Sequence, residues 1–327
     1  MNTPNEILRI NDLKTKFFLE EGTVFAVDGV DISLREKETL AIVGESGSGK
    51  SVTALSILKL IQEPTGRITD GEIHYRDRNL LDLSEKEMRK IRGNEISMIF
   101  QEPMTSLNPV FTIGKQIREV YKYHQGLNKR AGNRKAAEML DLVGIPNSEK
   151  CIHNYPFQLS GGMRQRVMIA MALACNPRIL MADEPTTALD VTIQSQIIKL
   201  LMDLKKEMRT AIILITHDLG VVAQLAENVM VMYMGKAVEY GDVKSIFHNP
   251  YHPYTKGLLN SIPQINDDHD RLKIIKGIIP SPFKLPAGCK YATRCDDVMD
   301  ICAKKEPAYQ EKENGRKVRC WKYTEGI

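Results

Sequence analysis

The chain has 327 residues, 43% of them hydrophobic and 26% charged, which is the composition of a folded globular protein and not of a disordered one. The sequence contains 45 Lys and Arg residues and 41 Asp and Glu residues, and the two signs are interspersed along the chain. No basic stripe of the kind that binds phosphate backbones stands out, so we expect no nucleic-acid partner. Acidic residues near Met1 argue against a signal peptide, and no apolar run reaches the roughly 18 residues needed to cross a bilayer.

The first hundred residues carry mainly strand signals. Apolar positions alternate through Val24–Leu34 and Thr39–Val43, and the second run ends at a glycine-rich turn followed by a predicted helix from Lys50 to about Ile61. Gly66–Met88 mixes turn signals with short alternating runs, which predicts antiparallel strands. A further strand is predicted at Ile96–Phe100.

The middle of the chain turns helical and polar between about residues 102 and 157, with helices predicted near Ile113–Tyr123 and Arg134–Val143. We interpret this segment as a helical subdomain inserted into an α/β body. Strand signals then return, with helices between them, as the repeated βα units of a parallel sheet require. These strands are predicted at Ile179–Ala182, Ala211–Ile215 and Val229–Met232.

A change of composition after Asn249 separates a C-terminal appendage from the body. The sequence there runs HNPYHPYTKG, continues through a proline-rich link and ends in a cluster of cysteines. The predicted domains are therefore 1–248, with the helical subdomain at about 102–157, and 249–327.

The glycine-rich turn fits the pattern GxxxxGK[ST] and lies where that pattern needs to lie, between a buried strand and a helix. Its backbone N–H groups can surround phosphate oxygens, Lys50 can neutralise the β- and γ-phosphates, and the Ser51 hydroxyl can coordinate Mg²⁺. The predicted ATP-binding residues of this loop are Gly44, Glu45, Ser46, Gly47, Ser48, Gly49, Lys50, Ser51 and Val52.

Two further motifs complement the loop. The apolar run before Asp183 and Glu184 predicts a buried strand that delivers two carboxylates at a ligand-binding sheet edge, with Asp183 near Mg²⁺ and Glu184 near the attacking water. A second phosphate-ready helix start follows Ser160, which suits an N-cap. This signature segment comprises Leu159, Ser160, Gly161, Gly162 and Met163.

These motifs together, with Gln101 after a strand, Asp190 and His217, resemble the ABC ATPase family in content, order and spacing over roughly residues 7–248. The resemblance implies an α/β P-loop core, with a parallel sheet, an antiparallel β subdomain and an inserted helical subdomain. It implies that Gln101 helps hold Mg²⁺, that His217 contacts the γ-phosphate and that Asp190 couples two sites. For the adenine it implies an aromatic near the first strands, and Phe17 is preferred to Phe18.

The resemblance also implies that two such chains pair head to tail, so that the signature segment of one closes on the γ-phosphate held by the other. Met163 departs from the family, which most often has Gln there. Soluble ABC ATPases of DNA repair or translation are the alternative class, but they carry inserted coiled coils or two cassettes, and neither feature is present. A non-hydrolysing regulatory cassette would lack an intact phosphate loop or Glu184.

Four cysteines lie in the last 40 residues with the spacing C-x5-C-x6-C-x17-C. This spacing predicts a four-thiolate site but does not identify the metal. These are Cys289, Cys295, Cys302 and Cys320. The appendage resembles the C-terminal region of dipeptide and oligopeptide importer ATPases, which implies a 4Fe–4S cluster, with zinc as the alternative.

That resemblance implies a peptide-transporting ATPase, peripheral on the cytoplasmic face of the membrane. Its partners would be a second, different ATPase subunit, two permease subunits and an extracytoplasmic binding protein. Importers of nickel and glutathione share this subunit type and are the alternatives for the solute.

Overall fold

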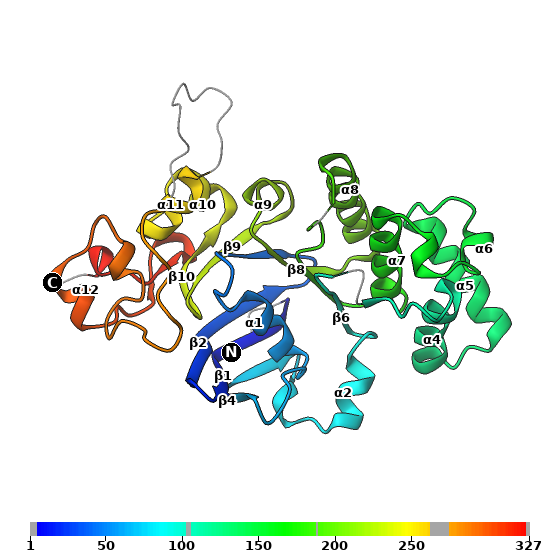
Figure 1. Ribbon diagram of the computed structural model, residues 1–327, viewed down its shortest axis with the longest axis horizontal. Helices are drawn as coiled ribbons and strands as arrows, with labels where there is room; N and C mark the ends of the chain where they lie inside the picture. The colour runs from blue at the N-terminus through cyan, green and yellow to red at the C-terminus, as the bar shows by residue number, and fades with distance from the viewer. Residues whose placement is uncertain (1–4, 103–105, 188, 262–274, 325–327) are drawn as a thin grey trace. The chain divides into compact units, whose positions relative to one another are not determined.

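The computed structural model describes residues 5–102, 106–187, 189–261 and 275–324, and it falls into two compact units (Figure 1). The first unit comprises the chain up to Leu34, Thr39–Leu81 and the chain from Ile215 onward. The second comprises Arg35–Glu38 and Asp82–Leu214. Among the described residues, no helix is both long and apolar enough to cross a membrane.

An antiparallel sheet forms one layer of the first unit, in the strand order β2-β1-β4-β5. β1 pairs with β4 from Leu8 opposite Tyr75 to Phe17 opposite Gly66. The strands are β1 (Glu6–Leu19), β2 (Gly22–Arg35), β4 (Gly66–Tyr75) and β5 (Arg78–Asn79), and the short helix η1 (Leu80–Asp82) follows them.

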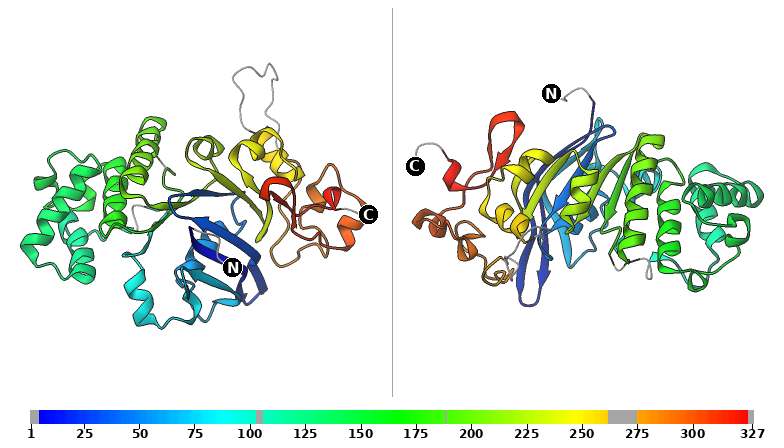
Figure 2. Two further views of the ribbon diagram at one scale, coloured as in Figure 1. Left: turned by 180° about the vertical axis from the view of Figure 1, so that it is seen from behind. Right: turned by 90° about the horizontal axis from the view of Figure 1, so that it is seen from above.

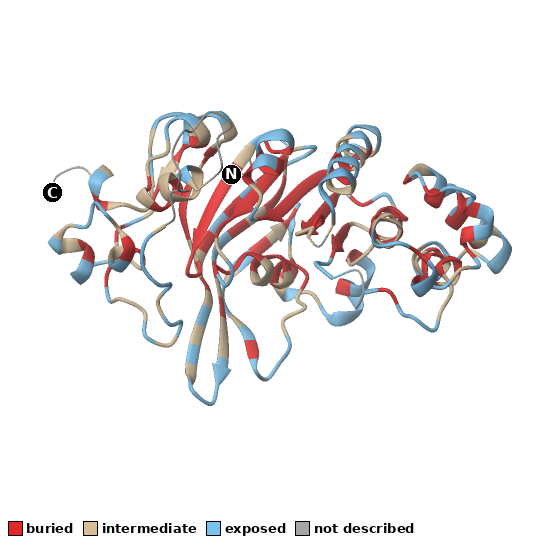
Figure 3. Ribbon diagram, turned by 45° about the horizontal axis from the view of Figure 1, so that its top comes forward, coloured by how far each residue is buried: buried red, intermediate tan, exposed pale blue. Residues whose placement is uncertain are grey.

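A second set of strands carries the core of the first unit. β3 (Thr39–Val43) pairs in parallel with β9 (Asn228–Tyr233), which pairs antiparallel with β10 (Lys236–Asp242). Every residue of β3 is buried, and Figure 3 shows buried residues concentrated along the strands while the helices expose their outer faces. The helices that accompany these strands are α1 (Lys50–Ile57), α9 (Leu219–Leu225) and α10 (Val243–His248).

The C-terminal part of the chain continues this set of strands. Glu239 and Tyr240 of β10 pair antiparallel with Val318 and Lys317 of β12, so the last strands cover the outer edge of β10. The backbone N–H of Arg319 also donates to the carbonyl of Val238 at 2.9 Å. The elements of this part are α11 (Pro253–Asn260), η3 (Ala292–Arg294), α12 (Asp300–Lys304), β11 (Gln310–Glu311), η4 (Glu313–Gly315), β12 (Lys317–Val318) and η5 (Trp321–Tyr323).

The second unit combines strands with a group of helices. β6 and β7 run parallel, with Ile96 opposite Ile179. Figures 1 and 2 show α4, α5, α6 and α7 gathered together, and α4 packs against both α5 and α7. The elements are α2 (Glu85–Ile91), β6 (Ile96–Ile99), α4 (Ile113–Gln125), α5 (Lys129–Leu142), α6 (Ser148–Cys151), η2 (Pro156–Gln158), α7 (Gly161–Leu173), β7 (Ile179–Asp183), α8 (Val191–Met208) and β8 (Ala211–Thr216).

Three local expectations were wrong. α1 ends at Ile57 and not at Ile61, because Lys59 adopts a positive φ of 49° that a helix cannot continue. Residues from Glu85 onward form helix α2 and no strand, because Ser84 and Glu87 make a reciprocal capping box. α5 begins at Lys129, earlier than predicted, because the Asn128 side chain accepts the Ala131 N–H at 3.0 Å.

Candidate nucleotide-binding site

The phosphate loop joins β3 to α1 in a conformation that glycine alone permits at two positions. Gly44 and Gly49 have φ values of +153° and +101°. A Cβ added at Gly44 would lie 2.2 Å from the carbonyl oxygen of Met232, and one at Gly49 would lie 2.2 Å from that of Ala26. The backbone therefore passes too close to its neighbours for any side chain at either position.

Lys50 lies inside the loop that it terminates. Its side chain is almost fully buried, and its Nζ donates to the carbonyls of Gly44 at 2.8 Å and Glu45 at 3.0 Å. Gly49 at the N-cap supplies no side chain to the first amides of α1, so the start of this helix, with Ser51 and Val52, suits an anion. Ser46 and Gly47 are exposed, and Ser48 is buried.

Glu45 has partners that the sequence did not predict. Its carboxylate accepts from both terminal nitrogens of Arg294, at 2.6 and 3.0 Å, and its backbone N–H donates to the Tyr254 hydroxyl at 2.8 Å. The two partners come more than 200 residues later in the chain, so no local spacing links them to the loop.

The second unit brings together two of the predicted catalytic residues. Asp183 is buried at the end of β7, and Glu184 follows it with a positive φ of 46°. Oε2 of Glu184 accepts from Nε2 of Gln101 at 2.8 Å and from Oγ1 of Thr187 at 2.8 Å. These bonds fix the carboxylate at the end of the strand, and the bond from Thr187 was not predicted.

The signature segment opens α7. The Ser160 hydroxyl accepts the Met163 N–H at 3.3 Å, so the predicted N-cap is present, and Ser160 and Gly161 are exposed while Leu159 is buried. A Cβ on Gly162 would lie 2.9 Å from the Ile193 side chain.

The remaining predicted site residues lie at a helix start, after a strand and in the first strand. Asp190 caps α8 by accepting the Ile193 N–H at 2.9 Å. His217 is exposed directly after β8. The ring of Phe17 lies against Gly66, where a Cβ would come within 2.8 Å of it, whereas Phe18 is 47% exposed. Phe17 is thus the more confined of the two candidates for the adenine.

The four C-terminal thiols share one neighbourhood. Burial first, and then the charges of the other thiols of the set, raise the pKa of Cys289 and of Cys295 to about 11 each. The backbone N–H of Cys289 donates to the carbonyl of Cys302 at 2.8 Å. Within the described ranges, however, no group of three or more His, Cys, Asp or Glu side chains is placed to hold a metal ion, so the geometry does not support the predicted metal site.

Cys151 and Cys175 lie in the second unit, away from this set in the sequence. Cys151 is buried and Cys175 is half-buried, and burial raises the pKa of both thiols.

Two family models match the chain. The ABC transporter model matches residues 27–187, and the model described as the oligopeptide/dipeptide transporter C-terminal region matches residues 238–302.

Similar proteins match over nearly the whole length. The oligopeptide transport ATP-binding protein AppD of Bacillus subtilis (strain 168) is 53% identical over 98% of this chain and 97% of its own. The dipeptide transport ATP-binding protein DppD of the same organism is 49% identical over 97% and 94%.

Solved structures match the cassette part. The dimeric post-hydrolysis state of the ATP-binding cassette MJ0796, bound to ADP and Pi, has a TM-score of 0.65 and 29% identity over 72% of this chain and 98% of that one. The structure of cbiO1 from Clostridium perfringens, part of the ABC transporter complex cbiONQ, has a TM-score of 0.62 and 27% identity over 75% and 92%.

Proposed function

Since the chain belongs to the ABC transporter ATP-binding proteins of oligopeptide and dipeptide transport, we propose how its motifs divide the work of ATP hydrolysis in a peptide importer. The nucleotide-binding domain comprises residues 1–248, with a helical subdomain at about 102–157, and residues 249–327 form the C-terminal region.

The phosphate loop binds the triphosphate of ATP. The loop from Gly44 to Ser51 presents backbone N–H groups at the start of α1, and Val52 continues that helix start. The N–H of Glu45 is not among them, because it donates to the Tyr254 hydroxyl. Lys50 exchanges its bonds to the loop carbonyls for bonds to the β- and γ-phosphates. The Phe17 ring stacks on the adenine. Ser51, Gln101 and Asp183 would hold Mg²⁺, which prefers such oxygen donors and would neutralise charge on the phosphates.

Glu184 is the general base for the attacking water, and the bonds that hold its carboxylate are the observation that carries this role. With Gln101 and Thr187 both donating to Oε2, the carboxylate is oriented at the end of β7, where a general base is needed to accept a proton from water. His217, which directly follows β8, contacts the γ-phosphate, as the family resemblance implies.

A second ATPase subunit completes each site. The exposed start of α7 at Ser160 to Met163 faces the γ-phosphate of the partner's nucleotide, and Asp190 couples the two sites. We propose that this partner is a different chain, so the protein alone is a largely monomeric and weak ATPase. Strong ATPase activity that is independent of protein concentration and of any partner would contradict this.

The chain works at the cytoplasmic face of the membrane as the ATPase of the importer. The chain binds two permease subunits peripherally, and these receive peptide from an extracytoplasmic binding protein.

The test of the function is Lys50→Ala in the importer reconstituted with its permeases in vesicles. We expect ATP hydrolysis and peptide uptake to be lost together, because the loop loses its cation at the β- and γ-phosphates. Lys59→Ala is the matched control: Lys59 follows α1, and its Nζ donates to the carbonyl of Leu81, outside the phosphate loop. Hydrolysis by Lys50→Ala at the wild-type rate would exclude this assignment.

We also propose a 4Fe–4S cluster on Cys289, Cys295, Cys302 and Cys320. The family resemblance and the shared neighbourhood of the thiols support it. A single zinc ion held by the same four thiolates is the alternative.

Anaerobically purified protein should then be brown and hold about four irons per chain, and Cys302→Ser should remove the colour. Colourless protein with one zinc per chain would exclude the iron–sulfur cluster. Metal-free protein with a protease-resistant C-terminal region would exclude any metal site.

A further inference from the structure

An ion pair connects the phosphate loop to the cysteine-containing segment. The Arg294 guanidinium donates through both terminal nitrogens to the two carboxylate oxygens of Glu45, at 2.6 and 3.0 Å. Arg294 ends η3 and directly precedes Cys295. Its side chain is only 4% exposed and that of Glu45 is 25% exposed, so solvent screens this pair far less than an ordinary surface pair.

The surroundings of Arg294 hold it in place. Its Nε donates to the carbonyl of Lys276 at 3.1 Å, and one terminal nitrogen donates to the Tyr233 hydroxyl at 3.4 Å. Tyr233 packs against Tyr254, with ring centroids 4.7 Å apart, and the Tyr254 hydroxyl accepts the backbone N–H of Glu45. Glu45 is therefore held both at its side chain and at its backbone by the C-terminal part of the chain.

We propose that Arg294 is a positioning residue for ATP binding: it holds the start of the phosphate loop and neutralises a carboxylate that would otherwise repel the phosphates. The inference rests on the proposed ATP site. Within the loop, Glu45 and Lys50 carry opposite charges. Without Arg294, the Glu45 carboxylate would repel the phosphates of ATP and so weaken the attraction between these phosphates and Lys50. Through this pair, the fold of the cysteine-containing segment sets the affinity of the loop for ATP.

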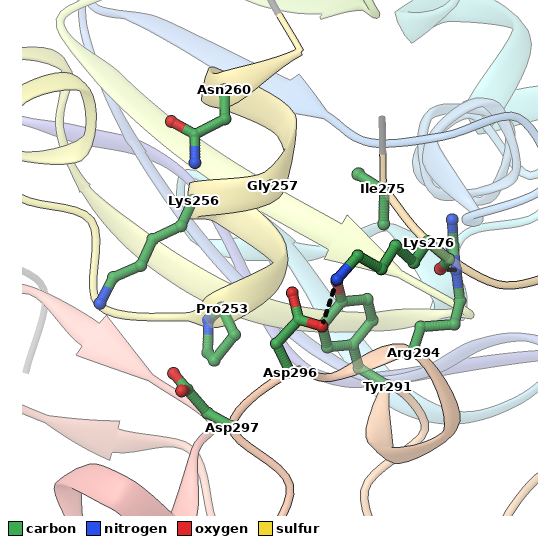
Figure 4. A pocket seen from close by; sticks show the side chains of 10 residues that line it. All are labelled: Pro253, Lys256, Gly257, Asn260, Ile275, Lys276, Tyr291, Arg294, Asp296 and Asp297. Carbon is green, nitrogen blue, oxygen red and sulfur yellow. Dashed lines mark hydrogen bonds and ion pairs between the residues drawn. The ribbon is translucent and has the colours of Figure 1, made fainter. Parts of the chain in front are cut away.

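The cavity beside Arg294 makes the test feasible. Figure 4 shows Arg294, Tyr291 and Lys276 along one side of a cavity of about 470 Å³, with Lys256 and Asn260 of α11 on another. Truncation of Arg294 enlarges an existing cavity and creates no closed void, so we expect Arg294→Ala to fold.

The experiment compares Arg294→Ala, Glu45→Gln and the double variant in the assembled importer. A fluorescent ATP analogue reports Kd, and steady-state hydrolysis reports KM and kcat. We expect Arg294→Ala to raise Kd and KM about tenfold and to leave kcat at saturating ATP nearly unchanged. Adding Glu45→Gln to Arg294→Ala should restore most of the affinity, because the unpaired carboxylate is then gone.

Two further variants sharpen the comparison. Arg294→Lys keeps the charge but loses the two-bond geometry, so its Kd should lie between those of the wild type and Arg294→Ala. Lys322→Ala is the matched control, because it removes an ion pair with Asp297 in the same C-terminal part that does not involve the loop.

Wild-type affinity in Arg294→Ala would overturn the proposal. A double variant that binds no better than Arg294→Ala would also overturn it, since the loss would then be structural and not electrostatic. If Arg294→Ala does not fold, wild-type affinity in Arg294→Lys would overturn the proposal in its place. Failure of the proposed ATP site itself is distinguishable, because Lys50→Ala would then bind the analogue normally.

Discussion

Glu239 of β10 carries a fully buried carboxylate that holds three groups of the C-terminal part. Oε1 accepts the Tyr251 N–H at 2.7 Å, Oε2 accepts the His252 N–H at 2.9 Å, and Arg316 donates at 3.2 Å from a side chain that is 6% exposed. Glu239→Ala leaves a buried guanidinium without its carboxylate and two amides without these acceptors.

The expected loss of stability follows from these contacts. Breaking a buried ion pair by removing one partner costs about 3–5 kcal/mol, and each buried amide that loses its acceptor adds about 1–3 kcal/mol unless water replaces it. Water can enter the space that the truncated side chain leaves, so we expect a total near the upper end of the first range. Glu239→Gln should lose less, because one side-chain oxygen still accepts.

The assay is urea unfolding followed by tryptophan fluorescence. Trp321 is the only tryptophan in the sequence, and it lies buried in η5 beside β12, so its signal reports on the part that Glu239 holds. Lys276→Ala is the control, because its ion pair with Asp296 joins side chains that are 77% and 79% exposed, so its loss should not move the midpoint measurably. A loss below about 1 kcal/mol in Glu239→Ala, with an unchanged urea dependence, would refute the reasoning.

Two other predictions concern catalysis and pH. Glu184→Gln should retain ATP binding while slowing turnover by roughly 10²-fold or more, as loss of a general base does, and an unchanged steady-state rate would move the base to another residue such as His217. Burial lowers the pKa of His252 to about 3, below the value near 6.5 of an unfolded histidine, so the unfolded chain binds this proton first. Stability should therefore fall by up to about 1.4 kcal/mol per pH unit as the pH decreases from about 6 towards 3, and should not depend on this group above pH 7. His252→Asn, which keeps an N-cap acceptor for the Tyr254 N–H, should flatten that slope in urea unfolding at pH 5 and 6; an equal slope would show that other groups cause it.

The parts of the fold that the sequence predicted are those set by local rules. The phosphate loop follows from glycine spacing between a buried strand and a helix, and the cap at Ser160 follows from its side-chain chemistry. The same rules contain the capping box of Ser84 and Glu87, but the alternating pattern before it favours a strand, and α2 was not predicted.

The parts that escaped prediction depend on residues far apart in the chain. Glu45 looks like a variable position of the loop until Arg294 and Tyr254 are seen beside it, and nothing at either position signals the other. The order of the C-terminal strands is another example, because a two-residue strand such as β12 has no periodicity to detect.

The pairing of β12 with β10 has a consequence for any attempt to produce the cassette alone. An uncovered outer edge of β10 would present backbone donors and acceptors to other chains, and such edges promote association between molecules. A protein cut after His248 should therefore form aggregates at concentrations where the full chain does not, even with its phosphate loop intact. We therefore expect the C-terminal region to keep the protein soluble by covering this strand edge, independently of any metal that the cysteines bind.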